Sequence, residues 1–400
     1  MKRKKQKISL VGILLIIVGC LIVTGSFFAF YVSSKLGNYV YIDDEDDFQK
    51  INENLDGNYK IVTSEIRFTK PFVTIGSEDK PFTGFLEGNG CILYNLFFNN
   101  EEKSQKGMFG KNQGIIKSFK VWINERNFKP NSFSFLDGES FGFVTPKNEG
   151  TITSVSIQND STHILEWKIN QSSKIGLITG ENFGTIRHCY VNTALEIEAH
   201  SDSVFGLLCG ISSESSLIER NKATISKISI NSSSDFSFGS LVGTSSGAIL
   251  KNNFISVNTF LSNCSNIKIG GAIGAIVETK KITSCEQMYV NFFLKSLSTN
   301  NLFLGGLIAS ALPNSFTVDG VIVNPNADID SEASYGELLA FAGDESSIKR
   351  SFYTQDLNII GSHYKNGEKK PVSSLTLEEL KWDISFWKLE NGNVVFKETY

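Results

Sequence analysis

Hydrophobic positions follow two different patterns along this chain. Residues 8–32 form one uninterrupted uncharged stretch, whereas later segments alternate hydrophobic and polar residues over short distances. About twenty apolar residues in a helix span a bilayer, so the first pattern predicts a membrane helix. Alternation with a period of two places every second side chain on one face, which predicts β-strands. We therefore expect an all-β body behind an N-terminal transmembrane helix.

A short glycine phrase recurs along the body of the chain. Its clearest copy runs from Gly176 to Ile186, with a second glycine four residues after the first. Eight copies follow one another at intervals of 30 to 35 residues, and the last two carry Ala309 and Ala340 in place of the second glycine. The leading glycines are Gly107, Gly142, Gly176, Gly206, Gly239, Gly270, Gly305 and Gly336.

Such a repeat favours a β-solenoid with one coil per copy. Each coil buries its inward residues against the coils on either side, and glycine permits tight reversals and close backbone approach. A β-propeller is the main alternative, but a blade needs about forty residues, more than these intervals provide. We expect a parallel β-helix of about eight coils over residues 107–353.

The isoleucine that ends each phrase is predicted to start an inward-facing strand. We expect these isoleucines to stack in one interior ladder. Cys189 and Cys285 each stand three residues after such an isoleucine, so both are predicted to be buried thiols on one inward stripe. Asn148, Asn182 and Asn252 fit turn or asparagine-ladder positions. The predicted ladder contains Ile116, Ile152, Ile186, Ile218, Ile249, Ile282 and Ile348.

Charge decides the orientation of the predicted membrane helix. Because positive flanks stay in the cytoplasm, residues from about Ser33 onward should lie outside the cell. A cleaved secretory signal and a lipoprotein acylated at Cys20 are the alternatives. The run is longer than a usual signal core, and apolar rather than polar residues follow Cys20. The basic residues before the run are Lys2, Arg3, Lys4, Lys5 and Lys7.

Composition and charge mainly exclude classes of partner and of functional site. A formal charge of −4 and a pI near 5.8 give no broad basic field, so nucleic acid is not an expected partner. Five cysteines lie beyond the apolar run, at scattered positions and without CxxC spacing, and none of the four histidines begins an HExxH motif. We identify no catalytic, cofactor-binding or metal-binding residues. The five cysteines are Cys91, Cys189, Cys209, Cys264 and Cys285.

Two sets of acidic residues are candidates for metal binding or catalysis. The run Asp43 to Asp47 could bind calcium, but it lacks the glycine of a loop site and better fits a linker or helix start. Parallel β-helices also include polysaccharide lyases and hydrolases that use clustered carboxylates. Asp202, Glu214, Asp235 and Asp319 stand singly in predicted turns, where solvated side chains are expected.

The phrase from Gly176 to Val191 resembles the GLUG repeat of bacterial surface and adhesin-like proteins, which also occurs in accessory regions of IgA-specific metallopeptidases. Residues 46–66 and 82–96 resemble the capping helix and opening rung that precede such repeats, and residues 382–396 resemble the tail that closes them. The resemblance covers about residues 40 to 400. The peptidase zinc motif lies in a separate domain of those enzymes and has no counterpart here.

The expected organisation is a cytoplasmic basic tail (1–7), a transmembrane signal anchor (8–32), a linker with N-terminal cap and first coils (33–106), GLUG-like β-helix repeats (107–353) and a C-terminal capping segment (354–400). The basic flank, the apolar run and the resemblance together indicate a single-pass protein of the bacterial cell membrane with its body outside. The long lateral surface of a tethered solenoid favours a non-catalytic adhesion or interaction module. Its partners would be the membrane and an extracellular glycan or protein. A polysaccharide-active enzyme and a structural surface spacer remain alternatives.

The orientation can be tested by proteolysis. Protease added to intact cells should digest the chain beyond about residue 40, because the basic flank keeps residues 1–7 inside. Complete protection of that region would reverse the topology.

Overall fold

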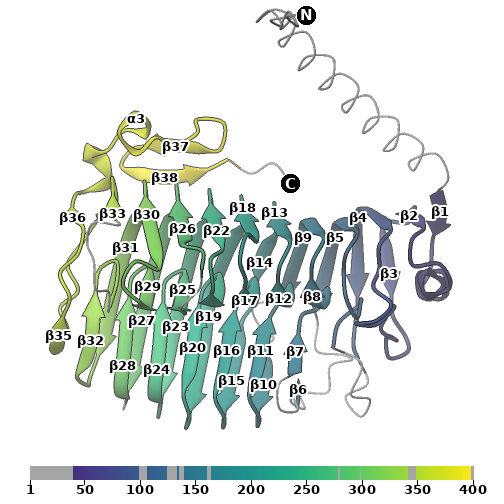
Figure 1. Cartoon of the computed structure of the whole chain (residues 1–400), viewed down its shortest axis with the longest axis horizontal. Helices are drawn as coiled ribbons and strands as arrows, with labels where there is room; N and C mark the ends of the chain where they lie inside the picture. The colour runs from purple at the N-terminus through teal and green to yellow at the C-terminus, as the bar shows by residue number, and fades with distance from the viewer. Residues whose placement is uncertain are drawn as a thin grey trace, which may run out of the picture.

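The computed structural model describes residues 39–98, 106–123, 133–134, 139–159, 164–277, 280–297, 299–340 and 348–397. Within these residues the chain forms a parallel β-solenoid, and the predicted all-β parallel β-helix is confirmed (Figure 1). The predicted basic tail and membrane helix, including Cys20, lie outside the described residues. No helix in the described part is long and apolar enough to cross a membrane.

Most strands of the solenoid belong to one long sheet of 22 strands, which we call the long sheet. Its strands pair in parallel with their counterparts in neighbouring coils. They are β1 (Tyr39–Ile42), β2 (Asn58–Ile61), β3 (Glu65–Arg67), β4 (Phe85–Tyr94), β5 (Ile115–Ile123), β6 (Phe133–Ser134), β9 (Thr151–Asn159), β10 (Leu165–Ile169), β13 (Thr185–Arg187), β14 (Tyr190–Asn192), β15 (Leu195–Ala199), β18 (Leu217–Glu219), β19 (Lys222–Ser232), β22 (Ile249–Lys251), β23 (Phe254–Ser262), β26 (Thr283–Glu286), β27 (Tyr289–Leu297), β30 (Phe316–Asp319), β31 (Ile322–Ile329), β33 (Ile348–Lys349), β34 (Phe352–Tyr353) and β36 (Glu368–Lys369).

Two smaller parallel sheets complete the coils from β7 (Glu139–Phe141) onward. The second sheet has eight strands, which are β7 (Glu139–Phe141), β11 (Ser173–Gly176), β16 (Ser203–Gly206), β20 (Phe236–Gly239), β24 (Ser265–Gly270), β28 (Asn300–Gly305), β32 (Ala333–Gly336) and β35 (Gly361–His363). The third sheet has six, which are β8 (Thr145–Asn148), β12 (Thr179–Asn182), β17 (Cys209–Ser212), β21 (Val242–Ser245), β25 (Ile273–Ile276) and β29 (Ile308–Ala311).

The leading glycines set the register between coils. From Gly176 to Gly336 they pair directly with one another along the second sheet, so one repeat corresponds to one coil, as predicted. A Cβ on Gly206 would lie against the carbonyl oxygen of Cys209 and 2.6 Å from the backbone nitrogen of Gly243. The chain therefore leaves the second sheet for the third at a point where no side chain fits.

The isoleucine ladder is confirmed in part. Ile116, Ile152, Ile186 and Ile218 pair in sequence and are fully buried. The predictions for Ile249 and Ile282 are wrong, because these side chains are 39% and 52% exposed. Strand pairing instead continues the ladder through Leu250, Cys285 and Val318 to Ile348. A shift of one residue reverses the face of a strand, so residue type alone did not determine which side faces inward.

The two cysteines are buried, as predicted, but they lie on different stripes. Cys285 belongs to the ladder just described. The register of Tyr190 with its neighbours places Cys189 beside Val155 and Asn221, on the far side of a bend in the coil. The prediction of a common stripe is therefore wrong. It relied on Ile282, which lies outside the ladder.

The bend in each coil occurs at a residue with positive φ. These residues occupy one column on the outside of the long sheet, between consecutive strands of one coil such as β13 and β14. Asn252 is one of them, with φ of 54°, which confirms its predicted turn position. We call this the corner column, and it comprises Ser118, Ser154, His188, Arg220, Asn252, Gln287, Gly320 and Arg350.

Buried asparagines link coils at two positions. Asn112 Nδ2 donates to Asn148 Oδ1, and Asn148 Nδ2 donates to Asn182 Oδ1, each at 2.8 Å. This confirms the predicted ladder positions of Asn148 and Asn182. Beside the corner column, Asn221 Nδ2 donates to Asn253 Oδ1 at 3.0 Å. These amides satisfy buried polar groups that would otherwise destabilise the interior.

The N-terminal end of the solenoid is covered by a short helical segment. α2 (Glu45–Gln49) and the 3₁₀ turn η1 (Lys50–Glu53) bury Phe48 and Ile51. The Phe48 ring packs edge-on against Phe68 and Phe72. The expected capping helix is therefore present at this end.

The C-terminal segment, residues 371–397, folds back along the corner column instead of only covering the last coil (Figure 1). It contains η3 (Val372–Ser374), α3 (Leu377–Leu380) and a hairpin of β37 (Trp387–Glu390) and β38 (Asn393–Phe396). Its contacts reach four successive coils. The Arg220 guanidinium lies over the Phe386 ring, 4.0 Å from its centre, and Trp387 Nε1 donates to Asn252 Oδ1 at 3.1 Å. Gln287 Nε2 donates to the Lys381 carbonyl, and Trp382 Nε1 donates to the Gly320 carbonyl.

The corrected register gives a paired test. Ile186→Asp should lower the stability of the chain by about 3 kcal/mol or more, because it buries an unpaired carboxylate and leaves a void. Ile282→Asp should change stability by less than about 0.5 kcal/mol, because that side chain is exposed. Thermal and denaturant unfolding followed by circular dichroism would measure both. Equal losses for the two variants would contradict the register.

Candidate functional site

A groove lies on the outer surface between the second and third sheets. The second glycine of the phrase brings the two sheets together there: a Cβ on Gly210 would lie 2.5 Å from Ile175 N, and one on Gly243 would lie 2.8 Å from Phe205 N. The two sheets therefore meet at a sharp concave angle. The groove has a volume of about 560 Å³.

Facing side chains form the two walls of the groove. On the second sheet, Val204, Ser237 and Lys268 stand in register on consecutive strands. On the third sheet, Ile211, Thr244 and Ala275 do the same. The walls combine apolar surface with hydroxyl groups and one ammonium group. Lys268 forms no ion pair with the described residues.

A column of polar side chains forms one rim of the groove. The register of the second sheet aligns Asp202, Asp235, Asn266 and Asn301 on four successive coils, and all four are exposed. Asp202 Oδ1 accepts a hydrogen bond from the Asp235 backbone N–H at 3.2 Å. Asn301 Nδ2 donates to Asn266 Oδ1 at 2.7 Å. These bonds leave other polar atoms of the four side chains available to a ligand.

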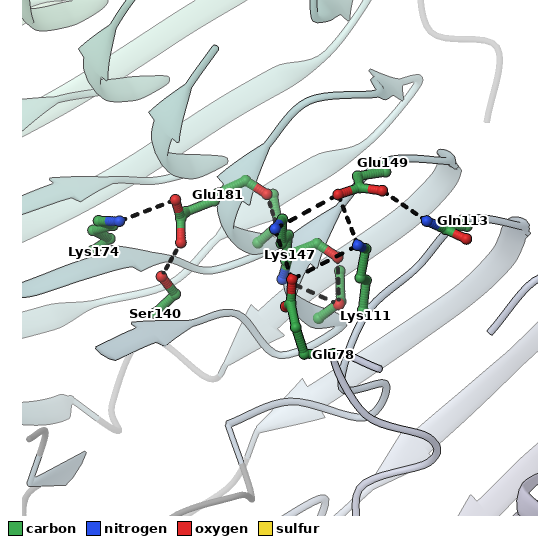
Figure 2. Close-up of polar contacts among 10 residues, drawn as sticks. Glu78, Lys111, Gln113, Ser140, Lys147, Glu149, Lys174 and Glu181 are labelled. Atoms are coloured by element: carbon green, nitrogen blue, oxygen red, sulfur yellow. Dashed lines mark hydrogen bonds and ion pairs between the residues drawn. The ribbon is translucent and has the colours of Figure 1, made fainter. Parts of the chain in front are cut away.

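An ion pair crosses the groove at one end (Figure 2). Lys174 of the second sheet and Glu181 of the third sheet lie 3.0 Å apart, and Ser140 Oγ donates to the other Glu181 oxygen at 2.6 Å. Glu181 is largely buried, with 21% of its side chain exposed. Because the pair joins both walls, it closes the groove toward the N-terminal coils.

A network of charges continues beyond this closed end (Figure 2). Lys147 Nζ lies 2.7 Å from Glu78, and Lys111 Nζ lies 2.9 Å from Glu149. Hydrogen bonding to Glu78 raises the pKa of Lys147. Burial alone would raise the pKa of Glu149, but hydrogen bonds from Gln113 and Lys111 outweigh it and lower that pKa. Both shifts favour the charged forms of Lys147 and Glu149, so the network holds its segments together rather than supplying a proton donor or acceptor.

The acidic residues that the sequence placed singly in turns have different surroundings in the structure. Asp202 and Asp235 do not stand singly, because the coil register brings them together on one rim. Asp319 forms an ion pair with Arg350 at the corner column. Glu214 is exposed in the turn between β17 and β18. Only the first two of these residues line the groove.

The acidic run near the N-terminus begins a helix, as expected. Asp44 is the N-cap of α2, and its Oδ1 accepts from the Asp47 backbone N–H at 2.8 Å. Asp47 also pairs with Lys50 at 2.6 Å, and this hydrogen bond lowers the pKa of Asp47. Carboxylate oxygens of Asp43, Asp44 and Asp47 lie within 4.8 Å of one another. The capping bond and the lysine contact account for this arrangement.

The sequence-based reasoning missed Lys174, Lys268 and Glu181. The repeat itself indicates that these three positions lie on the outer surface. Each lysine stands two residues before a leading glycine, and Glu181 directly follows a second glycine. Strand alternation places both positions on the outer face. What the repeat did not indicate is that the two outer faces meet.

Comparisons with known proteins add to the description of the fold. No protein-family model matches this chain, and no curated protein matches it. A Bacteroides ovatus protein, described as a candidate immunoglobulin A1 protease, aligns over 91% of this chain and 93% of its own at 15% identity, with a TM-score of 0.47. An IgA1 protease aligns over 80% of this chain and 22% of its own at 13% identity, with a TM-score of 0.41. Similarity at this level carries no argument about activity, and the GLUG resemblance stays an interpretation of the sequence.

The cysteines are placed for packing rather than for nucleophilic chemistry. All five described cysteines are buried and free. Burial raises the pKa of Cys189 to about 12 and that of Cys285 to about 12. A thiol that stays protonated and inaccessible is a poor nucleophile.

Thiol labelling tests this assignment. At about pH 7.5, a charged maleimide should leave Cys189 and Cys285 of the native protein unmodified. Both thiols should react after the protein is unfolded in guanidinium chloride. A Ser226→Cys variant, at an exposed position on β19, should react at once and serves as the positive control. Peptide mass mapping distinguishes the sites. Rapid native labelling of Cys189 would show that its stripe faces outward.

Proposed function

We propose that this chain is a non-catalytic bacterial surface module that binds an extracellular glycan or protein in the groove between its second and third sheets. The observation that carries the proposal is the exposed polar rim, on which Asp202, Asp235, Asn266 and Asn301 stand on successive coils. A regular row of hydrogen-bonding groups beside a concave wall suits an extended ligand lying along the solenoid axis.

The arrangement of carboxylates favours binding over hydrolysis. Glycoside hydrolysis needs two carboxyl groups on opposite sides of the scissile bond. Asp202 and Asp235 lie on the same rim, one directly bonded to the backbone of the other. On the opposite wall one carboxylate, Glu181, stands in register with Ile211, and it is already held by Lys174 and Ser140. The polysaccharide-active alternative would therefore find its second carboxylate engaged in an ion pair and a hydrogen bond.

The spacer alternative also fits less well. A surface that only separates other parts should carry scattered Ser, Asn and Lys side chains. Here two carboxylates, Phe303 and the Lys268 ammonium group, which pairs with no carboxylate among the described residues, gather in one concavity. Such local concentration of different polar and apolar groups is typical of binding sites.

Retention at the cell surface is proposed from the sequence. The basic residues before the uncharged run would keep the N-terminus inside and the groove outside. A tether of this kind would hold many copies at one surface. Weak binding by each copy then adds up to strong attachment.

A groove-filling substitution tests the proposed function. The detergent-solubilised full chain should bind at least one member of an array of bacterial and host glycans and extracellular-matrix proteins. Ser237→Trp should reduce that binding at least tenfold, because Ser237 stands in the middle of one wall.

The matched control is Asn258→Trp, at an exposed position of β23 on the long sheet. It adds the same bulk elsewhere and should bind as the unchanged chain does. Thermal midpoints of both variants confirm folding. Binding that is unaffected by Ser237→Trp in a folded protein would place the site elsewhere, and no binding to any array member would favour the spacer.

A further inference from the structure

We infer that the groove takes a linear, uncharged glycan of about four sugar rings, lying along the solenoid axis with one ring per coil. This inference rests on the proposed function and names the ligand class of the same site. It follows from the spacing of the rim, from the pairing of the strands and from the charges that line the groove.

The spacing of the rim groups fits a sugar chain. Adjacent parallel strands lie about 4.8 Å apart, so each rim side chain repeats at that distance along the axis. A pyranose unit in an extended glycan advances by nearly the same distance, so each coil can offer one rim side chain to one ring. An extended peptide rises about 3.4 Å per residue and presents the same face about every 6.8 Å, which does not match the coils.

The groove also offers no free strand to a peptide. Extended peptides often bind by adding a strand to the open edge of a sheet. β16, β20 and β24 each pair on both sides with neighbouring strands of the second sheet. β17, β21 and β25 do the same in the third sheet. Ligand contacts must therefore be made by side chains, which suits the hydroxyl groups of a glycan.

Charge favours an uncharged chain over a polyanion. The groove carries Asp202 and Asp235 against Lys268, because Lys174 is already paired with Glu181. A uronic acid polymer would place its carboxylates beside the two rim carboxylates. The Asp and Asn side chains can instead hydrogen-bond ring hydroxyls, and the apolar faces of the rings can pack on Val204, Ile211 and Phe303.

The length of the ligand follows from the length of the rim. The Lys174–Glu181 pair closes one end of the groove and occupies the coil whose rim position is Ser172. From there the rim runs through Asp202, Asp235, Asn266 and Asn301, which covers about 14 Å at the usual strand spacing. Four rings occupy this distance, and further rings would extend beyond the groove.

Calorimetry of the full chain in detergent tests the inference. The probes are linear β-1,3-, β-1,4- and α-1,4-linked oligomers of glucose and N-acetylglucosamine with two, four and six rings. For at least one linkage, affinity should rise at least tenfold from two rings to four and change less than about threefold from four to six. Asp235→Ala should weaken binding of the four-ring oligomer at least tenfold.

The matched control is Glu332→Ala. Glu332 is an exposed carboxylate that the register places in the same column, one coil beyond Asn301, but it does not line the groove. Its removal should leave affinity unchanged. Equal effects of the two substitutions would overturn the placement of the ligand.

Other outcomes separate the two proposals. Oligogalacturonate, a chain of uronic acids, serves as the charged probe. If it binds more tightly than every uncharged oligomer, or if no oligomer binds, the inferred ligand class is overturned. If an array protein instead binds and Ser237→Trp blocks it, the proposed groove function stands while the glycan inference fails. If Ser237→Trp changes no binding at all, both fail.

Discussion

Close backbone approach at the two glycines of each coil determines the cross-section of this solenoid. At Gly206 a Cβ would collide with backbone atoms of its own coil and the next, and at Gly210 it would collide with the strand of the preceding coil. The first restriction permits the reversal from the second sheet to the third. The second lets the two sheets close on each other. The groove is therefore a direct product of the residues that make the repeat.

The groove and the interior obey the same register. Backbone pairing aligns the leading glycines, and this alignment also fixes the rim residues four positions earlier. A change of turn length elsewhere in a coil leaves these positions matched. Loops can vary in length without disturbing the row of polar groups, because the glycine phrase restarts the register in every coil.

Much of the fold could be predicted from the sequence, because evenly spaced glycines and alternating strands constrain it strongly. Spacing from the leading glycine did not determine the interior ladder: Ile186 and Ile249 both lie ten residues after theirs, and only Ile186 faces inward. Before Ile249 the chain passes through Gly247 with φ of 87°, and the strand resumes with Leu250 facing inward. Ile282 precedes its strand altogether. Residue type suggested an inward side chain at both places, whereas hydrogen bonding between coils decided otherwise.

The candidate site was less accessible to prediction, because it depends on an angle between sheets rather than on a local pattern. Asp202 and Asp235 lie 33 residues apart, and their proximity appears only when the coils are stacked. The interval between repeats contains that information. The concave meeting of two outer faces does not follow from strand alternation, since a similar repeat could be arranged with those faces turned apart.

The C-terminal segment has a consequence for how the molecule resists being pulled apart. Solenoids tend to unravel coil by coil from their ends, because each coil contacts only its neighbours. Here Trp382, Trp387 and Phe386 fasten one segment across coils containing Arg220, Asn252, Gln287 and Gly320. Before the C-terminal coils can unfold one by one, this segment must detach from all four coils. The segment therefore joins the four coils into one mechanical unit. A sideways load on the solenoid would therefore pass through that unit before any single coil opens.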